Sequence, residues 1–274
     1  MFFDFVHRLI DVHSLIGQET REKLRVLHLF GGPFITVGHQ QTDVPGGCKR
    51  LLVFVALHRG RVERRYVAGA LWPVGNDERA AGNLRSAMWR LNKAGIRLLA
   101  SDKHCLSLQQ DVLVDVHLVS SWAARLLAGT AADSELSIIP TGVDALDLLP
   151  GWYDDWVLIE RERVRQRLLH ALEAQSRQLT RQGRWAEAVE AAMMAVSAEP
   201  LRESAQRALI EAHIAEGNMV EGRRSFEAYR DMLNRELAAE PDPTLAALLR
   251  PVELSLATGR GRPAHGGWVG AART

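Results

Sequence analysis

The chain has 274 residues, of which 47% are hydrophobic, and its formal net charge at pH 7 is +1. This length and apolar content are enough for two domains with hydrophobic cores. It has only two cysteines, so we expect no disulfide framework. No apolar run approaches the ~18 residues of a membrane span, and polar residues interrupt the N-terminal segment, so we expect neither a membrane anchor nor a signal peptide. These features together predict a cytoplasmic protein.

Residues 1–24 form an N-terminal extension of unassigned role, and residues 25–118 predict a small α+β domain. The first elements predicted by the apolar patterns are two strands followed by two helices: Arg25–Phe30, Phe34–Val37, Lys49–His58 and Arg65–Leu71. A turn at residues 31–33 joins the two strands, and Pro73 ends the second helix.

The next helix has two unlike faces. Its apolar residues recur at the helical period and predict a buried stripe: Ala80, Leu84, Ala87, Met88 and Leu91. The opposite side, here named the outer face, carries Arg85, Ser86, Trp89, Arg90 and Lys93, with Asn83 at its edge. Such side chains suit phosphates and base edges in a DNA major groove, although a solvated amphipathic helix explains this one helix equally well.

The elements after this helix favour the DNA-binding interpretation. Two short strands, Ile96–Leu99 and Cys105–Leu108, flank the hairpin signal at residues 101–104, and residues 112–116 predict another strand. This order is that of a winged helix-turn-helix, in which the third helix enters the groove and Lys103 at the hairpin tip contacts the DNA backbone or minor groove.

Charge is divided unequally along the chain. Residues 25–118 hold 13 Lys and Arg against 7 Asp and Glu, whereas residues 140–255 hold 14 against 20. The first segment therefore has a net charge of +6 and the second a net charge of −6, which indicates that only the first is built for a polyanion. A charge of +6 is modest, so tight DNA binding would require dimerisation or neighbouring half-sites.

The second half is predicted to be all α. Residues 119–145 read as a linker with a connecting helix, residues 146–255 as successive helices, and residues 256–274 as a disordered tail. The turns at Gly183 and Gly217 are 34 residues apart, which is the tetratricopeptide period. We therefore expect a predominantly α protein, with an α+β N-terminal winged helix-turn-helix followed by an all-α tetratricopeptide-like helical domain.

No pattern in the sequence points to catalysis. The histidines and cysteines lack metal-ligand spacing, and there is neither a Gly-x-x-x-x-Gly-Lys-Ser/Thr loop nor a nucleophile elbow. We therefore expect no enzyme activity, no cofactor and no metal.

The order of these segments resembles the SARP family of actinobacterial transcriptional activators, in which a response-regulator-type winged helix precedes a bacterial transcriptional activator domain. The resemblance covers residues 25–250 approximately, and its strongest segments are residues 71–73, 83–91, 148–156, 160–163 and 183–218. It implies sequence-specific binding to double-stranded promoter DNA and recruitment of RNA polymerase, frequently to genes of secondary metabolism. Asn92 departs from the family, whose members commonly carry a basic residue there.

Roles follow for the individual residues. Arg85 and Arg90 are the leading DNA contacts, with an intraprotein ion pair of Arg85 to Asp77 or Glu78 as the rival. Lys93 and Lys103 suit phosphates, and Ser86 is a weaker phosphate candidate. Asn83 either reads adenine or caps the helix, and Trp89 either stacks on DNA or, as its size favours, packs against the hairpin.

Two further segments have competing interpretations. The loop from Val74 to Glu78 corresponds to one that touches polymerase in response-regulator winged helices, so Asp77 and Glu78 are candidate polymerase contacts, with a tight structural turn as the alternative. Trp152, Tyr153 and Trp156 are assigned to the core.

The alternative function is a protein-interaction adaptor, in which the helical hairpins act and the winged helix does not bind DNA. The modest charge and Asn92 keep this alternative open. The two functions differ in salt dependence, because DNA affinity falls steeply as salt rises.

Overall fold

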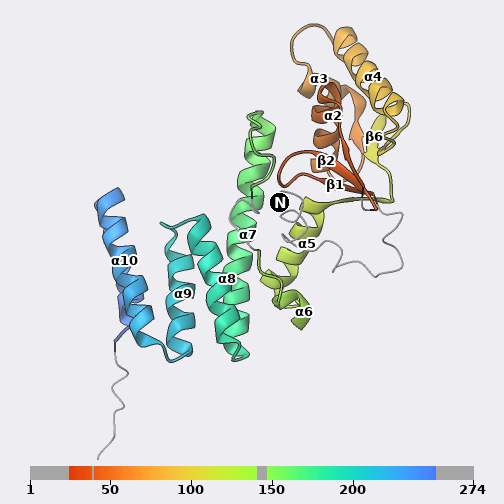
Figure 1. Ribbon diagram of the computed structural model, residues 1–274. Helices are drawn as coiled ribbons and strands as arrows, with labels where there is room; N and C mark the ends of the chain where they lie inside the picture. The colour runs from red at the N-terminus through yellow and green to blue at the C-terminus, as the bar shows by residue number, and fades with distance from the viewer. Residues whose placement is uncertain (1–24, 39, 141–146, 251–274) are drawn as a thin grey trace, which may run out of the picture.

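The computed structural model describes residues 25–38, 40–140 and 147–250. Strands and helices form one part of the molecule, and a row of helices forms the other (Figure 1). The expected α+β part followed by an all-α part is confirmed. The N-terminal extension and the tail of the sequence-based division lie outside the described residues.

The first sheet has four strands in the order β3-β2-β1-β7. β1 pairs with β2 antiparallel and with β7 parallel. Its strands are β1 Arg25–His28, β2 Phe34–Val37, β3 Gln40–Asp43 and β7 Val112–Val114. The expected strand through Phe30 thus ends two residues early, and the strand expected to reach Val116 ends at Val114 because Asp115 opens a helix.

Three helices and a second sheet complete this part. The helices are α2 Gly46–Leu57, α3 Arg64–Leu71 and α4 Asp77–Lys93. The second sheet has the order β4-β6-β5, with strands β4 Val62–Glu63, β5 Leu99–Ser101 and β6 Cys105–Leu108. The strand expected at Ile96–Leu99 therefore begins at Leu99: Ile96 and Leu98 are buried as the pattern predicts, but precede the paired residues.

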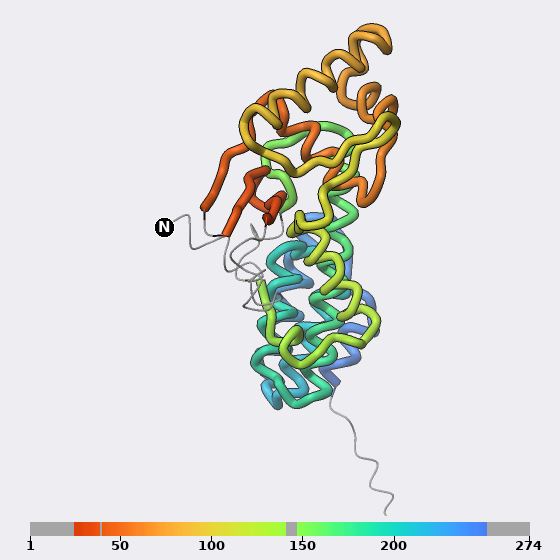
Figure 2. Tube along the Cα trace, turned by 90° about the vertical axis from the view of Figure 1, so that its right-hand side faces the viewer, coloured from red at the N-terminus to blue at the C-terminus, as the bar shows by residue number. Residues whose placement is uncertain are grey.

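Successive helices between residues 155 and 237 run antiparallel to one another. The helix at residues 115–128 instead runs parallel to the helix at residues 155–181, since Gln178 near the end of the second donates a hydrogen bond of 2.6 Å to the Leu126 carbonyl oxygen near the end of the first. Figure 2 shows these helices stacked below the strand-containing part. Gly183 and Gly217 take positive φ angles of 75° and 87° at two of the turns, which only glycine adopts without strain. The helices are α5 Asp115–Ala128, α6 Asp133–Leu136, α7 Asp155–Arg181, α8 Trp185–Ala198, α9 Glu203–Ala215, α10 Met219–Leu237 and α11 Pro243–Ala247.

A single hydrophobic cluster continues from α2 into α7. The rings of Phe54 and Trp156 meet edge to face with centroids 5.1 Å apart, and Trp152 lies 6.5 Å from Trp156. Both tryptophans contribute to this core as expected. Tyr153 does not: it is 80% exposed, because it precedes α7 and points outside the packed stripe.

Candidate nucleic-acid interface

Helix α4 is fixed at both ends by its own sequence. The Asn76 side chain caps the helix by accepting a hydrogen bond of 2.9 Å from the Arg79 N–H. Asp77 and Glu78 in the first turn and basic residues in the last turn suit the helix dipole. Asn83 lies in the helix interior, so its alternative role as a cap is wrong, and it stays available as a DNA contact.

The predicted buried stripe of α4 is confirmed. Ala80, Leu84, Ala87 and Leu91 are each at most 6% exposed, whereas Met88, the fifth residue of the predicted stripe, is only half-buried at the edge of the core. The Cys48 thiol of α2 donates a hydrogen bond of 3.4 Å to the Ala87 carbonyl oxygen, which joins the two helices at the centre of the stripe. Since this packing fixes the rotation of α4, it also fixes which side chains face outward.

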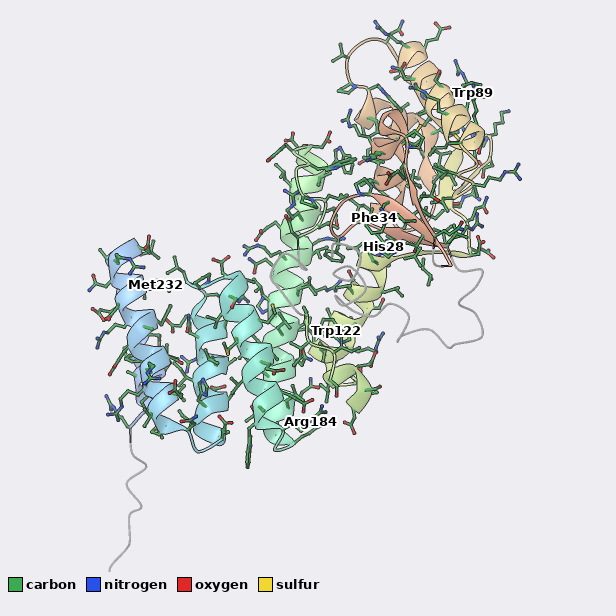
Figure 3. The ribbon with its side chains drawn as sticks, in the orientation of Figure 1. His28, Phe34, Trp89, Trp122, Arg184 and Met232 are labelled. Carbon is green, nitrogen blue, oxygen red and sulfur yellow. The ribbon has the colours of Figure 1, made fainter. Side chains whose placement is uncertain are left out.

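The five residues of the outer face are exposed, whereas Asn83 at its edge is half-buried. Trp89 lies on the side of α4 that faces away from the rest of the molecule (Figure 3), and the residue is 60% exposed. The interpretation that packed this ring against the hairpin is therefore wrong. The Lys93 Nζ lies 4.9 Å from the centre of the ring, so that a cation and an aromatic surface are presented together.

The two leading arginines differ in their surroundings. Arg85 forms no ion pair with any residue that the structure describes, and the rival partner Asp77 lies 3.3 Å from Arg65 of α3 instead. Arg90 is held locally: its Nε donates a hydrogen bond of 3.3 Å to the Ser86 carbonyl oxygen.

The guanidinium of Arg90 also lies against the first turn of α2. A Cβ at Gly47 would come within 2.8 Å of its Nη1, so a side chain at this position would displace the flexible end of Arg90. Arg90 is thereby placed between α4 and the exposed N–H groups at the start of α2.

The hairpin tip between β5 and β6 is organised by Asp102. Its carboxylate accepts hydrogen bonds of 2.8 Å from the N–H groups of His104 and Cys105 and pairs with Arg61. These N–H groups hold the pKa of Asp102 below its ordinary value. Lys103 and His104 are left exposed at the tip.

A hollow of about 630 Å³ separates the tip from α3 and α4, and both Arg85 and Lys103 line it. The structure thus brings the hairpin and the first half of the outer face to one surface. Arg64 and Arg65 of α3 also line the hollow, and sequence reasoning missed both of them. The sequence did hold a signal for them, since they are adjacent cations at the start of the helix that precedes α4.

The loop before α4 is an exposed turn. Val74 is 86% exposed, and Gly75 has a φ of 117°. Asp77 and Glu78 follow, both exposed. This segment has the accessibility that a protein contact requires.

Other chemistry has little support in the described part of the chain. It contains no group of three or more His, Cys, Asp or Glu side chains placed to hold a metal ion. Both cysteines are free, and burial raises the pKa of the Cys48 thiol. None of the described helices has the length and hydrophobicity needed to span a membrane.

Comparisons with known proteins concern the family and the fold. Residues 141–252 match the family model of the bacterial transcriptional activator domain. No curated protein matches the sequence. The fold is similar to a solved structure of Mycobacterium tuberculosis EmbR in complex with a low affinity phosphopeptide, with a TM-score of 0.61 and 20% sequence identity. That match covers 83% of this chain and 64% of the EmbR chain, so this chain spans less than two thirds of that protein's length.

Proposed function

We propose that the chain is a SARP-type transcriptional regulator that binds promoter DNA sequence-specifically and activates transcription by recruiting RNA polymerase. The match of residues 141–252 to the bacterial transcriptional activator domain and the similarity of the fold to EmbR support this proposal. The observation that carries the DNA-binding part is the outer face of α4. Its cations Arg85, Arg90 and Lys93 have no acidic partner among the described residues, on a helix whose rotation is fixed by packing. Phosphates and base edges would supply the missing acceptors.

The surroundings of each side chain suggest its role. Arg85 is unrestrained and suits a bidentate contact to a guanine edge. Arg90 lies against the start of α2 and suits a phosphate, as do Lys93 and Lys103. Asn83 would read adenine from the edge of the outer face.

Shape also supports docking of α4 in the major groove. The hairpin tip and α4 share one surface, so the tip would reach the backbone or the adjacent minor groove while α4 occupies the major groove. The net charge of this part is modest, so we propose that two copies bind repeated half-sites and share the affinity.

Recruitment of polymerase is assigned to the exposed loop before α4. Asp77 and Glu78 would contact the enzyme while the outer face holds DNA. Replacing both with alanine is expected to abolish activated transcription in a reconstituted assay and to leave DNA affinity unchanged. An equal loss of DNA affinity would contradict this division of roles.

DNA binding itself is tested by selecting duplexes from a random pool and measuring affinity by fluorescence anisotropy at several salt concentrations. We expect selected duplexes to bind more tightly than unselected ones, with an affinity that falls steeply with salt. The matched control is Arg181→Ala, an exposed arginine at the end of α7, which should leave affinity unchanged. If the folded protein enriches no sequence and shows no salt-dependent binding, the protein-interaction adaptor becomes the better explanation.

A further inference from the structure

One face of α7 continues beyond the helix that covers it. Trp156, Ile159, Arg163 and Arg167 fall on this face, because their spacings of three, four and seven residues return to the same side of a helix. Trp156 packs on Phe54 of α2, but α2 ends at Leu57. The turns of α7 that follow Trp156 are therefore uncovered on this side: Ile159 is 67% exposed and the Arg163 side chain 64% exposed.

Cations from both parts of the molecule gather at this place. Arg59 follows the end of α2, five residues after Phe54, whose ring lies 5.1 Å from that of Trp156 on α7. Its pKa is lowered first by partial burial and then by repulsion from Arg163 and Arg167, against a smaller attraction from Glu160. Arg163 pairs with Glu160 at 2.6 Å. Within the described chain, neither the Arg59 nor the Arg167 side chain has a hydrogen bond or an ion pair. Positive charge is thus in excess here.

Apolar side chains accompany these arginines. Tyr66 of α3 is 56% exposed, and its ring lies 5.7 Å from that of His58, directly before Arg59. Ile159 lies one turn before Arg163 on α7. Arginines beside exposed aromatic and aliphatic side chains are typical of protein interfaces rather than of solvated surfaces.

We propose that this junction surface, formed by Arg59, Tyr66, Ile159, Arg163 and Arg167, binds an acidic protein segment with apolar side chains among its carboxylates. Arginine binds carboxylates with two parallel hydrogen bonds, which accounts for the acidic part of the partner. Tyr66 and Ile159 account for its apolar part. Promoter DNA is not the occupant, because α4 lies on the far side of α2 from α7 (Figure 1).

The junction surface contains residues from both parts of the molecule, so binding there would affect how the two parts are joined. Arg59 belongs to the winged-helix part, whereas Arg163 and Arg167 belong to α7 of the helical part. An acidic segment bound across them would join the two parts and relieve the repulsion between their arginines.

The test uses the full chain and a fluorescein-labelled peptide that alternates Asp and Glu with Leu and Phe, with binding followed by anisotropy. A comparison peptide keeps the acidic residues and carries serine at the apolar positions. We expect the first peptide to bind more tightly than the second. The double variant R59E/R167E should weaken binding by about tenfold or more, and Ile159→Ser by about threefold.

Arg181→Glu, the same charge reversal at the far end of α7, is the matched control and should change peptide affinity little. Affinity for a DNA duplex is measured on every variant and should be unchanged, so a failure of DNA binding is distinguishable from a failure of this proposal. Equal binding of both peptides, or equal losses for R59E/R167E and Arg181→Glu, would overturn the proposal. So would a loss of DNA affinity in R59E/R167E, which would make the surface a DNA contact.

Discussion

The cations of α4 and those of the helical part differ in whether they have carboxylate partners. In the helical part most arginines pair with carboxylates: Arg165 with Glu162 and Glu199, Arg184 with Glu187, Arg202 with Glu173, and Arg224 with Glu221. On α4, Arg85 and Lys93 have no carboxylate partner among the described residues. Arginine content alone therefore does not separate the two regions; the lack of carboxylate partners on α4 does, and it favours an anionic ligand on that helix.

Two of these pairs, Arg165 with Glu199 and Arg202 with Glu173, join different helices, whereas the others lie within one helix or at its start. The Glu173 side chain of α7 is 3% exposed and receives hydrogen bonds of 2.6 Å from Arg202 Nε and 2.8 Å from the Ser204 hydroxyl at the start of α9. A buried carboxylate needs these donors, because desolvation would otherwise destabilise its charge. These charges position the repeats and are not available to a ligand.

The largest effect is expected from breaking this buried pair. Arg202→Ala leaves Glu173 with the weaker partner Arg177 at 3.6 Å, so we expect a loss of about 3 kcal/mol in the free energy of unfolding. Urea denaturation measures it. Arg224→Ala removes an exposed pair and should cost at most ~0.5 kcal/mol. Equal losses for the two variants would break the distinction between buried and exposed pairs.

Asp115 is a second buried carboxylate, but unlike Glu173 it has no arginine partner among the described residues. Asp115 accepts hydrogen bonds of 2.8 Å and 3.0 Å from the Leu29 and Phe30 N–H groups, and His28 Nδ1 lies 3.9 Å away. Burial raises its pKa to about 7. Because the folded pKa exceeds the unfolded one, this group stabilises the fold fully below about pH 4, and the contribution is lost as pH rises through 7.

The size of that loss is on the order of 4 kcal/mol, since the pKa rises from 3.8 to about 7 and one pKa unit corresponds to ~1.4 kcal/mol. Thermal unfolding of wild type and Asp115→Asn from pH 4 to 8 measures it: the stability difference between them should change with pH across this window. A difference independent of pH would show that Asp115 does not titrate there.

The unpaired cations should matter for DNA and not for stability. Arg85→Ala is expected to weaken binding to a selected duplex by about 2 kcal/mol and to relax its sequence preference. Lys93→Ala should weaken all duplexes evenly and reduce the salt slope by about 1. Both variants should unfold within ~0.5 kcal/mol of wild type. A destabilised Arg85→Ala with unchanged DNA affinity would place Arg85 with the paired arginines.

The smallest effect concerns the start of α4. Asn76→Ala removes the cap and should cost about 1 kcal/mol of stability. Asn83→Ala, within the same helix, should leave stability nearly unchanged and affect DNA affinity only. Circular dichroism melts separate the two, and an equal loss of stability in Asn83→Ala would return Asn83 to a structural role.

Sequence periodicity predicted α4 and its buried stripe because a helix that packs on one side repeats its apolar residues every three to four positions. The same reasoning missed β3, whose residues Gln40–Asp43 are all exposed and which pairs only through its backbone with β2. It also placed the strand before the hairpin at Ile96, because burial and strand pairing begin at different residues there.

The outer face was likewise readable from spacing, since the residues opposite a buried stripe are exposed. Which residues form ion pairs with one another could not be predicted from the sequence. That Asp77 pairs with Arg65 rather than with Arg85 depends on how α3 packs against α4, a relation between two helices that local sequence does not encode. The exposure of Tyr153 beside two packed tryptophans has the same origin.

The central claim is that the uncompensated outer face of α4 binds promoter DNA. The most direct test is genome-wide promoter occupancy of the tagged protein in its source organism, beside an Arg85→Ala/Arg90→Ala double variant expressed and folded to the same level. We predict sharp peaks upstream of a small number of operons for wild type and their loss in the double variant. Wild-type peaks that persist unchanged in the variant, or no peaks for either protein, would contradict the claim.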